Sequence, residues 1–246
     1  NTWVGEELRV IGAEGAVVHR FAEGEIGVRG GIFGANDPAG ALIAWRGWSL
    51  TDREAGIFER LPLAPLRIIS PAGSTPLQAP WVELVHEIDD RPGLYTALDL
   101  KFSEIGEAGF ILYDNRARDS AFDGFQYAWH TRFAALGARA NPLEDVDVVA
   151  QVLTGDTTMG RPTPTTSAVA VDFTSTFILV SRAWTQHRLS ARAEYFETID
   201  RDLSPDDDNS ERGTALTAAY VFRPLERHRL TTVSYTHLTL PTNREV

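Results

Sequence analysis

Residues 124–138 read GFQYAWHTRFAALGA, a stretch in which two unlike sets of residues alternate. One set consists of Phe125, Tyr127, Trp129, Thr131, Phe133 and Ala135. The other set consists of Gln126, Ala128, His130, Arg132, Ala134 and Leu136. A period of two residues is typical of a β-strand with two different faces, whereas an amphipathic helix repeats every ~3.6 residues. The stretch therefore predicts one long strand.

Other stretches alternate in the same way. They are Leu94–Phe102, Asp145–Thr154, Arg188–Glu197 and Thr214–Phe222. Strands of soluble proteins are typically ~5–6 residues long, and these are longer. A strand that crosses a membrane needs ~9–11 residues because it is tilted. Length therefore favours membrane-spanning strands over a soluble sandwich with one face in water.

The connections between these stretches alternate between short and long. Short connections fall at residues 103–107, 185–187 and 223–227, longer ones at 115–123, 155–167 and 199–213, and a moderate one at 137–144. Tight turns at one end and extended loops at the other are typical of outer-membrane barrels, and a Greek-key sandwich need not order its loops this way. The predicted fold class is all-β: an incomplete, antiparallel up-and-down transmembrane β-barrel of roughly twelve strands.

The first third of the chain is less regular. Ile26–Phe33 and Ala41–Ser49 are predicted to form a hairpin around the turn residues 34–40. Shorter strands are predicted at Glu7–Ile11, Ala16–Arg20, Leu66–Ile69 and Trp81–Glu87. The proline-rich residues 61–80 could link two domains, but their apolar content is high for a solvated linker. The alternative is that residues 61–90 fold inward as a constriction loop.

Composition argues against several classes of function. The chain has no cysteine, which excludes disulfides, Cys-ligated zinc and thiol catalysis. Its formal net charge of −11 makes a nucleic-acid partner unexpected. The sequence contains no nucleophile elbow, phosphate-binding glycine loop or His-Glu-x-x-His motif. We therefore predict no enzymatic activity, no cofactor and no metal site.

Two acidic stretches contain residue types that can bind a metal ion. Residues 200–202 and 206–211 cluster oxygen ligands of the kind that calcium prefers, but lack EF-hand spacing. A solvated acidic loop is the simpler interpretation. In residues 86–90, His86 and Glu87 would point to opposite faces of a strand, so these side chains are not expected to converge.

Several stretches resemble porin-like β-barrel proteins of Gram-negative outer membranes. They are residues 31–40 (GIFGANDPAG), 45–48 (WRGW), 188–196 (RLSARAEYF) and 218–224 (AAYVFRP). The resemblance covers most of residues 20–232. It implies a location in the cell outer membrane and passive diffusion of small hydrophilic solutes or ions through a charged lumen. It also implies contact with outer-membrane lipid, and leaves a homotrimer open.

A barrel would place one parity of each strand in the lumen and the other in lipid. The lumen-lining candidates are Asp99, Lys101, His130, Arg132, Asp147, Arg188, Arg192 and Glu194. The residues expected to face lipid include Phe125, Trp129, Leu189 and Tyr220. Aromatic residues expected to form interfacial girdles are Tyr113, Phe125, Trp184, Tyr195 and Phe222.

One porin-like domain is predicted over residues 1–232. Residues 233–242 (VSYTHLTLPT) resemble a translated sequencing adapter, so residues 233–246 are predicted to be a non-native tail. The natural chain is expected to continue past Thr232. Two alternative functions stay open: a soluble or periplasmic β-sandwich that binds carbohydrate, and a barrel at the cell surface that does not conduct.

Overall fold

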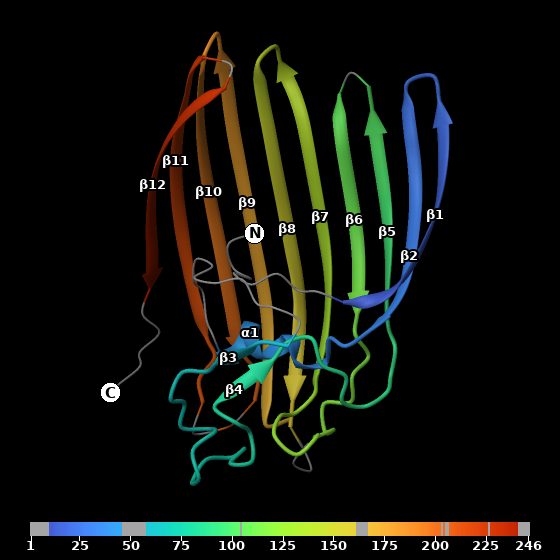
Figure 1. Ribbon diagram of the computed structural model, residues 1–246, viewed down its shortest axis with the longest axis vertical. Coiled ribbons are helices and arrows are strands. Elements are labelled where there is room, and N and C mark those ends of the chain that lie inside the picture. Colours follow the sequence, from blue (N-terminus) through green and yellow to red (C-terminus); the bar gives the residue numbers. More distant parts are fainter. Residues whose placement is uncertain are drawn as a thin grey trace.

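Ten long strands form one antiparallel sheet in this computed structural model. It describes residues 10–45, 58–103, 105–160, 167–202, 204, 207–225 and 227–240. The strands, in sheet order, are β1 (Ile11–Phe21), β2 (Gly24–Gly34), β5 (Gly93–Phe102), β6 (Gly106–Asp114), β7 (Trp129–Leu143), β8 (Val146–Met159), β9 (Val169–Trp184), β10 (His187–Asp200), β11 (Glu211–Leu225) and β12 (His228–Leu240). Sheet order follows chain order, as in a meander (Figure 1). The all-β, antiparallel prediction is confirmed.

The sheet is open over the described residues. Its edges are β1 and β12, and no pairing joins these two strands within the described ranges. Strand lengths run from nine residues in β6 to sixteen in β9, so the prediction of long strands is confirmed. β12 runs into residues 233–240, and their assignment to a non-native tail stays a prediction. None of the helices in the described ranges is long and apolar enough to cross a membrane.

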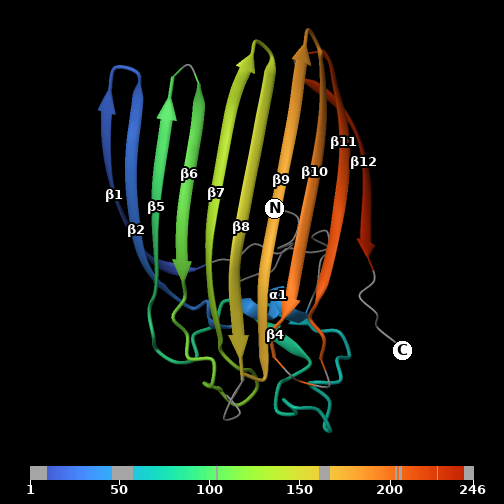
Figure 2. The same cartoon turned by 180° about the vertical axis from the view of Figure 1, so that it is seen from behind.

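Short and long connections gather at opposite ends of the sheet (Figures 1 and 2). We call these the turn end and the loop end. Of the described residues, the loop end carries 35–45, 58–92, 115–128, 160, 167–168, 201–202, 204 and 207–210. The predicted connection at 137–144 is wrong, because residues 137–143 belong to β7 and a tight turn follows. The strand predicted over residues 124–138 begins later, at Trp129. Residues 124–128 lie before β7 in a turn, where the Asp123 carboxylate accepts the N–H groups of Phe125 and Gln126.

The first third differs most from its prediction. β2 pairs with β5, and residues 41–45 form part of helix α1 (Gly40–Trp45), which follows a 3₁₀ turn over Asp37–Ala39. Pro38 suits the start of a helical turn, where its missing N–H is not needed. The rest of the predicted strand, residues 46–49, lies outside the described residues.

The other short predictions divide in a similar way. Residues 11 and 16–20 belong to the single strand β1, and residues 7–9 lie outside the described ranges. Residues 66–69 form turns instead of a strand. Trp81–Glu87 shortens to β4 (Trp81–Glu83), which pairs with β3 (Arg60–Pro62) in a small ribbon.

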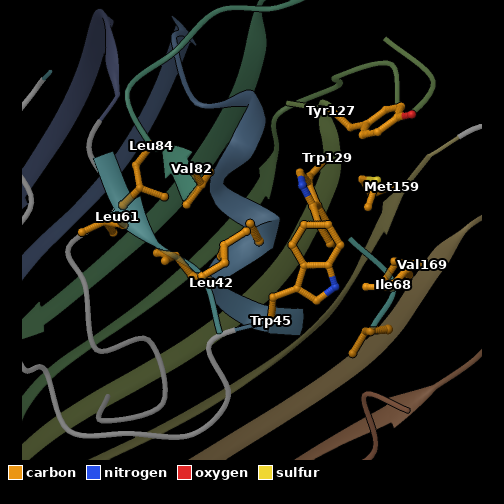
Figure 3. Packing of buried hydrophobic residues seen from close by; sticks show 13 residues of the cluster. Leu42, Trp45, Leu61, Ile68, Val82, Leu84, Tyr127, Trp129, Met159 and Val169 are labelled. Atoms are coloured by element: carbon orange, nitrogen blue, oxygen red, sulfur yellow. The ribbon is translucent and has the colours of Figure 1, made fainter. Parts of the chain in front are cut away.

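Residues 35–45 and 58–92, which together we call the insert, cover one face of the large sheet at the loop end. Trp129, Met159 and Val169 lie side by side across β7, β8 and β9 and therefore share this face. Figure 3 shows Leu42 and Trp45 of the insert beside Trp129, and the two indole rings meet edge to face at 4.8 Å. Leu61, Ile68 and Val82 belong to the same buried cluster. We call this the insert face and its opposite the outer face.

The insert corrects part of the lipid-facing prediction. Trp129 is buried on the insert face, and Phe125 lies in the 115–128 connection against Trp81, with ring centroids 4.8 Å apart. Leu189 and Tyr220 lie on the outer face and are exposed. At the loop end, the apolar side chains on one face of β7 are thus covered by the insert, whose residues lie far away in the sequence.

Candidate functional site

Charged side chains line the insert face between the insert and the turn end. Cross-strand pairing places six predicted residues on this face: Asp99, Lys101, Asp147, Arg188, Arg192 and Glu194. The insert face also carries charged residues that sequence reasoning missed. They are Glu14, Arg20, Glu25, Arg29, Glu107 and Arg139. In β1 and β2, the alternation of charged and uncharged residues could have assigned these side chains to one face, but glycines interrupt that pattern.

These charges are interleaved in sign and form ion pairs. Arg29 Nε lies 2.6 Å from Asp99 Oδ2, and Arg29 Nη1 lies 3.6 Å from Glu14 Oε2. Asp147 is shared between Arg139, at 2.9 Å, and Arg188, at 3.5 Å. Exposed pairs of this kind contribute only ~0–1 kcal/mol each to stability. They therefore act mainly on the electric field over this face.

A hollow of about 460 Å³ lies among these residues. Its lining includes Asp99, Lys101, Glu107, Arg139 and Gln151. The hollow is lined by charged side chains and is open to solvent. The side chains of Arg139 and Asp99 are about half exposed, at 52% and 45%. The charged side chains of this face can attract and orient small ions. Among the described residues that line the hollow, we find no arrangement of side chains typical of a catalytic site.

The outer face carries an uncharged band. On β8 its side chains are Val146, Val148, Ala150, Val152 and Thr154; on β9, Thr174, Thr176, Ile178 and Val180; on β10, Leu189, Ala191, Ala193 and Tyr195. Many of the large members are exposed, as Val152, Ile178, Val180 and Leu189 are. We call this the outer band. The polarity of the two faces is the reverse of that of a soluble sheet that buries its apolar side.

Charged pairs border the outer band at the loop end. Arg132 Nε lies 2.8 Å from Asp156 Oδ2, and His130 Nε2 lies 2.9 Å from Asp114 Oδ1. His130 and Arg132 were predicted to share a face with the other six candidates, and this is wrong. Their parity on β7 is opposite to that of Trp129, which is covered by the insert, so they lie on the outer face.

Aromatic rings border the outer band at the turn end. His187 stacks with Trp184, Tyr220 and Phe222 at centroid distances of 5.8, 5.9 and 4.9 Å. Of the predicted girdle residues, Trp184 and Phe222 belong to this group. Tyr195 also lies on the outer face, but closer to the loop end. Tyr113 lies on the insert face, stacked on Phe133, and Phe125 lies in a connection.

Three carboxylates converge where the insert begins and ends. Ligand atoms of Asp37, Glu87 and Asp89 all lie within 4.8 Å of one another. Asp37 is only 2% exposed, and its Oδ2 accepts the N–H groups of Ile88 and Asp89. Burial, together with the charges of Glu87 and Asp89, raises the pKa of Asp37 to about 7. Sequence reasoning missed this convergence, because β4 ends at Glu83 and the chain then turns.

A proton on Asp37 offsets part of the negative charge of this cluster. Three carboxylates alone do not define a metal site, and the high pKa of Asp37 means that it is largely protonated below pH 7. The protonated form removes one negative charge from the group. The cluster is therefore a pH-sensitive part of the insert.

Asp37→Asn is expected to raise the free energy of unfolding at pH 8 by about 4 kcal/mol. Because the folded-state pKa of about 7 exceeds the ordinary 3.8, wild-type stability should fall as pH rises between these values. Asparagine cannot ionise and can still accept the two backbone N–H groups. Denaturant unfolding at pH 4, 6 and 8 would measure the difference, which should vanish at pH 4.

The exposed Asp90→Asn is the matched control for this variant, because Asp90 lies next to the cluster in sequence. It should leave the pH profile of unfolding unchanged. An Asp37→Asn protein whose stability follows the wild-type pH profile would show that the pKa of Asp37 is the same in the folded and unfolded states.

The acidic loop at 201–210 is organised by its own carboxylates. Asp202 accepts the N–H groups of Ala170 and Ser204, at 2.8 and 2.7 Å, and burial raises its pKa to about 6. The Trp45 indole donates to Asp207 Oδ2 at 3.2 Å, which ties α1 to this loop. Asp206 lies outside the described residues. These bonds organise the loop more than the solvated interpretation implied.

Comparisons with protein-family models, with curated proteins and with solved structures found no match. Function is therefore argued from the polarity and geometry of the two faces.

Proposed function

We propose that this chain forms the wall of a porin-like channel, through which small hydrophilic solutes or ions diffuse passively. The observation that carries the proposal is the reversed polarity of the sheet. Ion pairs line the insert face, whereas the outer band is uncharged and exposed. In lipid this arrangement is favourable, because the apolar side meets acyl chains and the charged side meets a water-filled lumen.

The height of the outer band supports the same proposal. On β9, Arg182 follows Asp172 by ten residues, and the outer-face side chains between them are uncharged. At ~3.3 Å per residue this spans ~33 Å along the strand, or ~23 Å at a tilt of ~45°. The apolar band of outer-membrane barrels is ~25 Å tall and is flanked by aromatic girdles. The His187 aromatic group and the Arg132–Asp156 row border the outer band accordingly.

The proposal requires that both edge strands be paired in the membrane. An unpaired edge would leave backbone N–H and C=O groups in hydrocarbon, at a cost of several kcal/mol each. Barrels with open aqueous channels have roughly 16–18 strands, more than the ten described here. The proposed channel therefore includes strands beyond those ten, and a homotrimer is compatible with it.

The insert is proposed to narrow this channel at the loop end. Residues 61–84 pack on the insert face through Leu61, Leu63 and Val82. Because that face is the proposed lumen side, the insert would stand in the path of a solute. The proposal calls for no cofactor or catalytic group, and it places the chain in the outer membrane of a Gram-negative cell, in contact with lipid.

The soluble-sandwich alternative is less well supported. A sandwich buries the apolar face of one sheet under a second sheet. The β3–β4 ribbon, the second sheet in the described ranges, packs on the insert face and leaves the outer band exposed. A barrel that does not conduct is separated from a channel by conductance.

Purified full-length protein is expected to give stepwise single-channel currents in planar bilayers. Arg188→Gln should shift the reversal potential in a salt gradient toward cation selectivity by about twofold in permeability ratio, because a lumen cation is removed. Arg182→Gln is the control, since Arg182 lies nearby on β9 but on the outer face. Absence of conductance, or equal shifts in both variants, would reject the channel.

A further inference from the structure

Two acidic stretches of the sequence lie at the loop end of the sheet. One is residues 86–90 of the insert, and the other comprises residues 200–202 and 207–211, where β10 ends and β11 begins. The start of the insert contacts both. The Asp37 carboxylate, just before α1, accepts the N–H groups of residues 88 and 89, and the Trp45 indole, at the end of α1, donates to Asp207. Helix α1 therefore lies between stretches that are far apart in the sequence (Figure 1).

The carboxylates on the wall of the sheet are paired with arginines. Asp99 Oδ2 lies 2.6 Å from Arg29 Nε, and Glu194 Oε1 lies 2.7 Å from Arg192 Nη2. Asp147 lies within reach of two arginines, as described above. Because each of these negative charges has a positive charge beside it, the pairs largely cancel in the field that a passing solute meets.

The carboxylates at the loop end are held by uncharged donors instead. Glu87 accepts the Ala35 N–H at 2.7 Å, and Asp208 accepts the Ser210 N–H at 2.9 Å. Asp200 accepts the N–H groups of residues 202 and 209, at 2.9 and 3.0 Å. Within the described ranges, no arginine or lysine forms an ion pair with Glu87, Asp200 or Asp208. A backbone N–H fixes a carboxylate in place and favours its charged form without cancelling the charge.

The loop end therefore has an excess of fixed negative charge. Its described residues include eleven Asp and Glu, but six Arg and no Lys. A region lined by charges of one sign raises the local concentration of ions of the opposite sign, most of all where walls of low dielectric constant focus the field. Charged groups at such a position set the ion selectivity of a channel.

We propose that the loop end is a cation-attracting mouth, so that small cations pass through the channel in preference to anions. This inference rests on the proposed function, because selectivity requires a channel. In that channel the insert stands in the path of the solute, which must pass close to the acidic stretch at 86–90. The carboxylates act together through their field, and no single ion-binding site is assigned.

The absence of cysteine from the chain allows this field to be measured directly. Ser74 is exposed in the insert, and its hydroxyl lies 3.4 Å from that of Ser204 in the acidic loop. At pH 8, the thiol of Ser74→Cys should react about fivefold faster with a cationic than with an anionic methanethiosulfonate reagent, relative to free cysteine. That ratio corresponds to a local potential of just under one kT. It should approach unity at 1 M salt, where the Debye length is ~3 Å.

Neutral variants in the two acidic stretches test the source of the field. Asp90→Asn and Asp208→Asn each remove one charge from an exposed position, one in each stretch. Together they should lower the reagent ratio at Ser74→Cys by about twofold. Asp156→Asn is the matched control, because Asp156 lies at the same end of the sheet but on the outer face, paired with Arg132. It should leave the ratio unchanged.

Reversal potentials in a KCl gradient, measured with the full chain in planar bilayers, complete the test. The wild type should prefer K⁺, and the double variant should lower the ratio of cation to anion permeability by about twofold, whereas Asp156→Asn should not. Equal rates of the two reagents at Ser74→Cys would overturn the inference even if the protein conducts. A channel that favours Cl⁻ or does not discriminate would also overturn it, and would leave the proposed function standing. Absence of conductance would reject the proposed function, and the preference for cations with it.

Discussion

Val152→Arg is expected to prevent stable insertion of the protein into a bilayer, whereas Gln151→Arg, one residue earlier, is expected to insert normally. Val152 lies near the middle of the outer band on β8 and is 42% exposed. Gln151 lines the charged hollow on the insert face. An arginine on the lipid side of a barrel costs ~2–4 kcal/mol at the midplane and ~0–1 kcal/mol near the interface.

The same pair of variants distinguishes a membrane wall from a soluble sheet. In water, an arginine at an exposed position such as Val152 is tolerated, so both variants would fold. Folding into lipid vesicles, followed by the heat-dependent shift of gel migration, measures the difference. Thr154→Arg, next to the charged row at Asp156, should insert with an intermediate loss. Equal behaviour of Val152→Arg and Gln151→Arg would refute the assignment of faces.

The strands could be predicted because their signal is local. A period of two residues sustained over nine or more positions is sufficient for Leu94–Phe102 or Arg188–Glu197, and each lies within an observed strand. Alternation does not tell which parity is covered. For β7 the answer depends on Trp45, which lies 84 residues before Trp129 and covers it. His130 and Arg132 were therefore assigned to the wrong face.

Helix α1 and the contacts of His86 could not be predicted from the sequence, for a different reason. A short apolar run such as residues 41–45 fits a strand or a helix equally well, and burial against β7 and β8 decides for the helix. The contacts of His86 join residues that are 37 positions apart, namely His86 and Asp123. Such a meeting follows from the turn after Glu83, not from spacing.

Trp129→Ala is expected to reduce the free energy of unfolding by about 3–5 kcal/mol and to release the insert from the sheet. Trp129 is 1% exposed and packs edge to face with Trp45. The fit is close, since a Cβ added at Gly40 would lie 2.7 Å from Trp129 Cβ. Chemical unfolding gives the stability, and limited proteolysis of residues 58–92 shows whether the insert is released.

The insert is the part that should fail first, because it has little structure of its own. β3 and β4 pair over three residues each, and a two-stranded ribbon is only marginally stable by itself. The long sheet retains its ladders in the variant, so strand content should persist while the insert becomes cleavable. In the proposed channel, the same change should raise conductance, because the obstruction leaves the lumen side.

Trp184→Ala is the matched control, since Trp184 is 42% exposed on the outer face at the turn end. Its loss should change stability by less than about 1 kcal/mol and leave the insert protected. A double variant of Trp45 and Trp129 should show a coupling of about 0.5–1.5 kcal/mol, the scale of one aromatic pair. Equal losses in Trp129→Ala and Trp184→Ala, or an insert that stays protected without Trp129, would mean that other contacts hold the insert on the sheet.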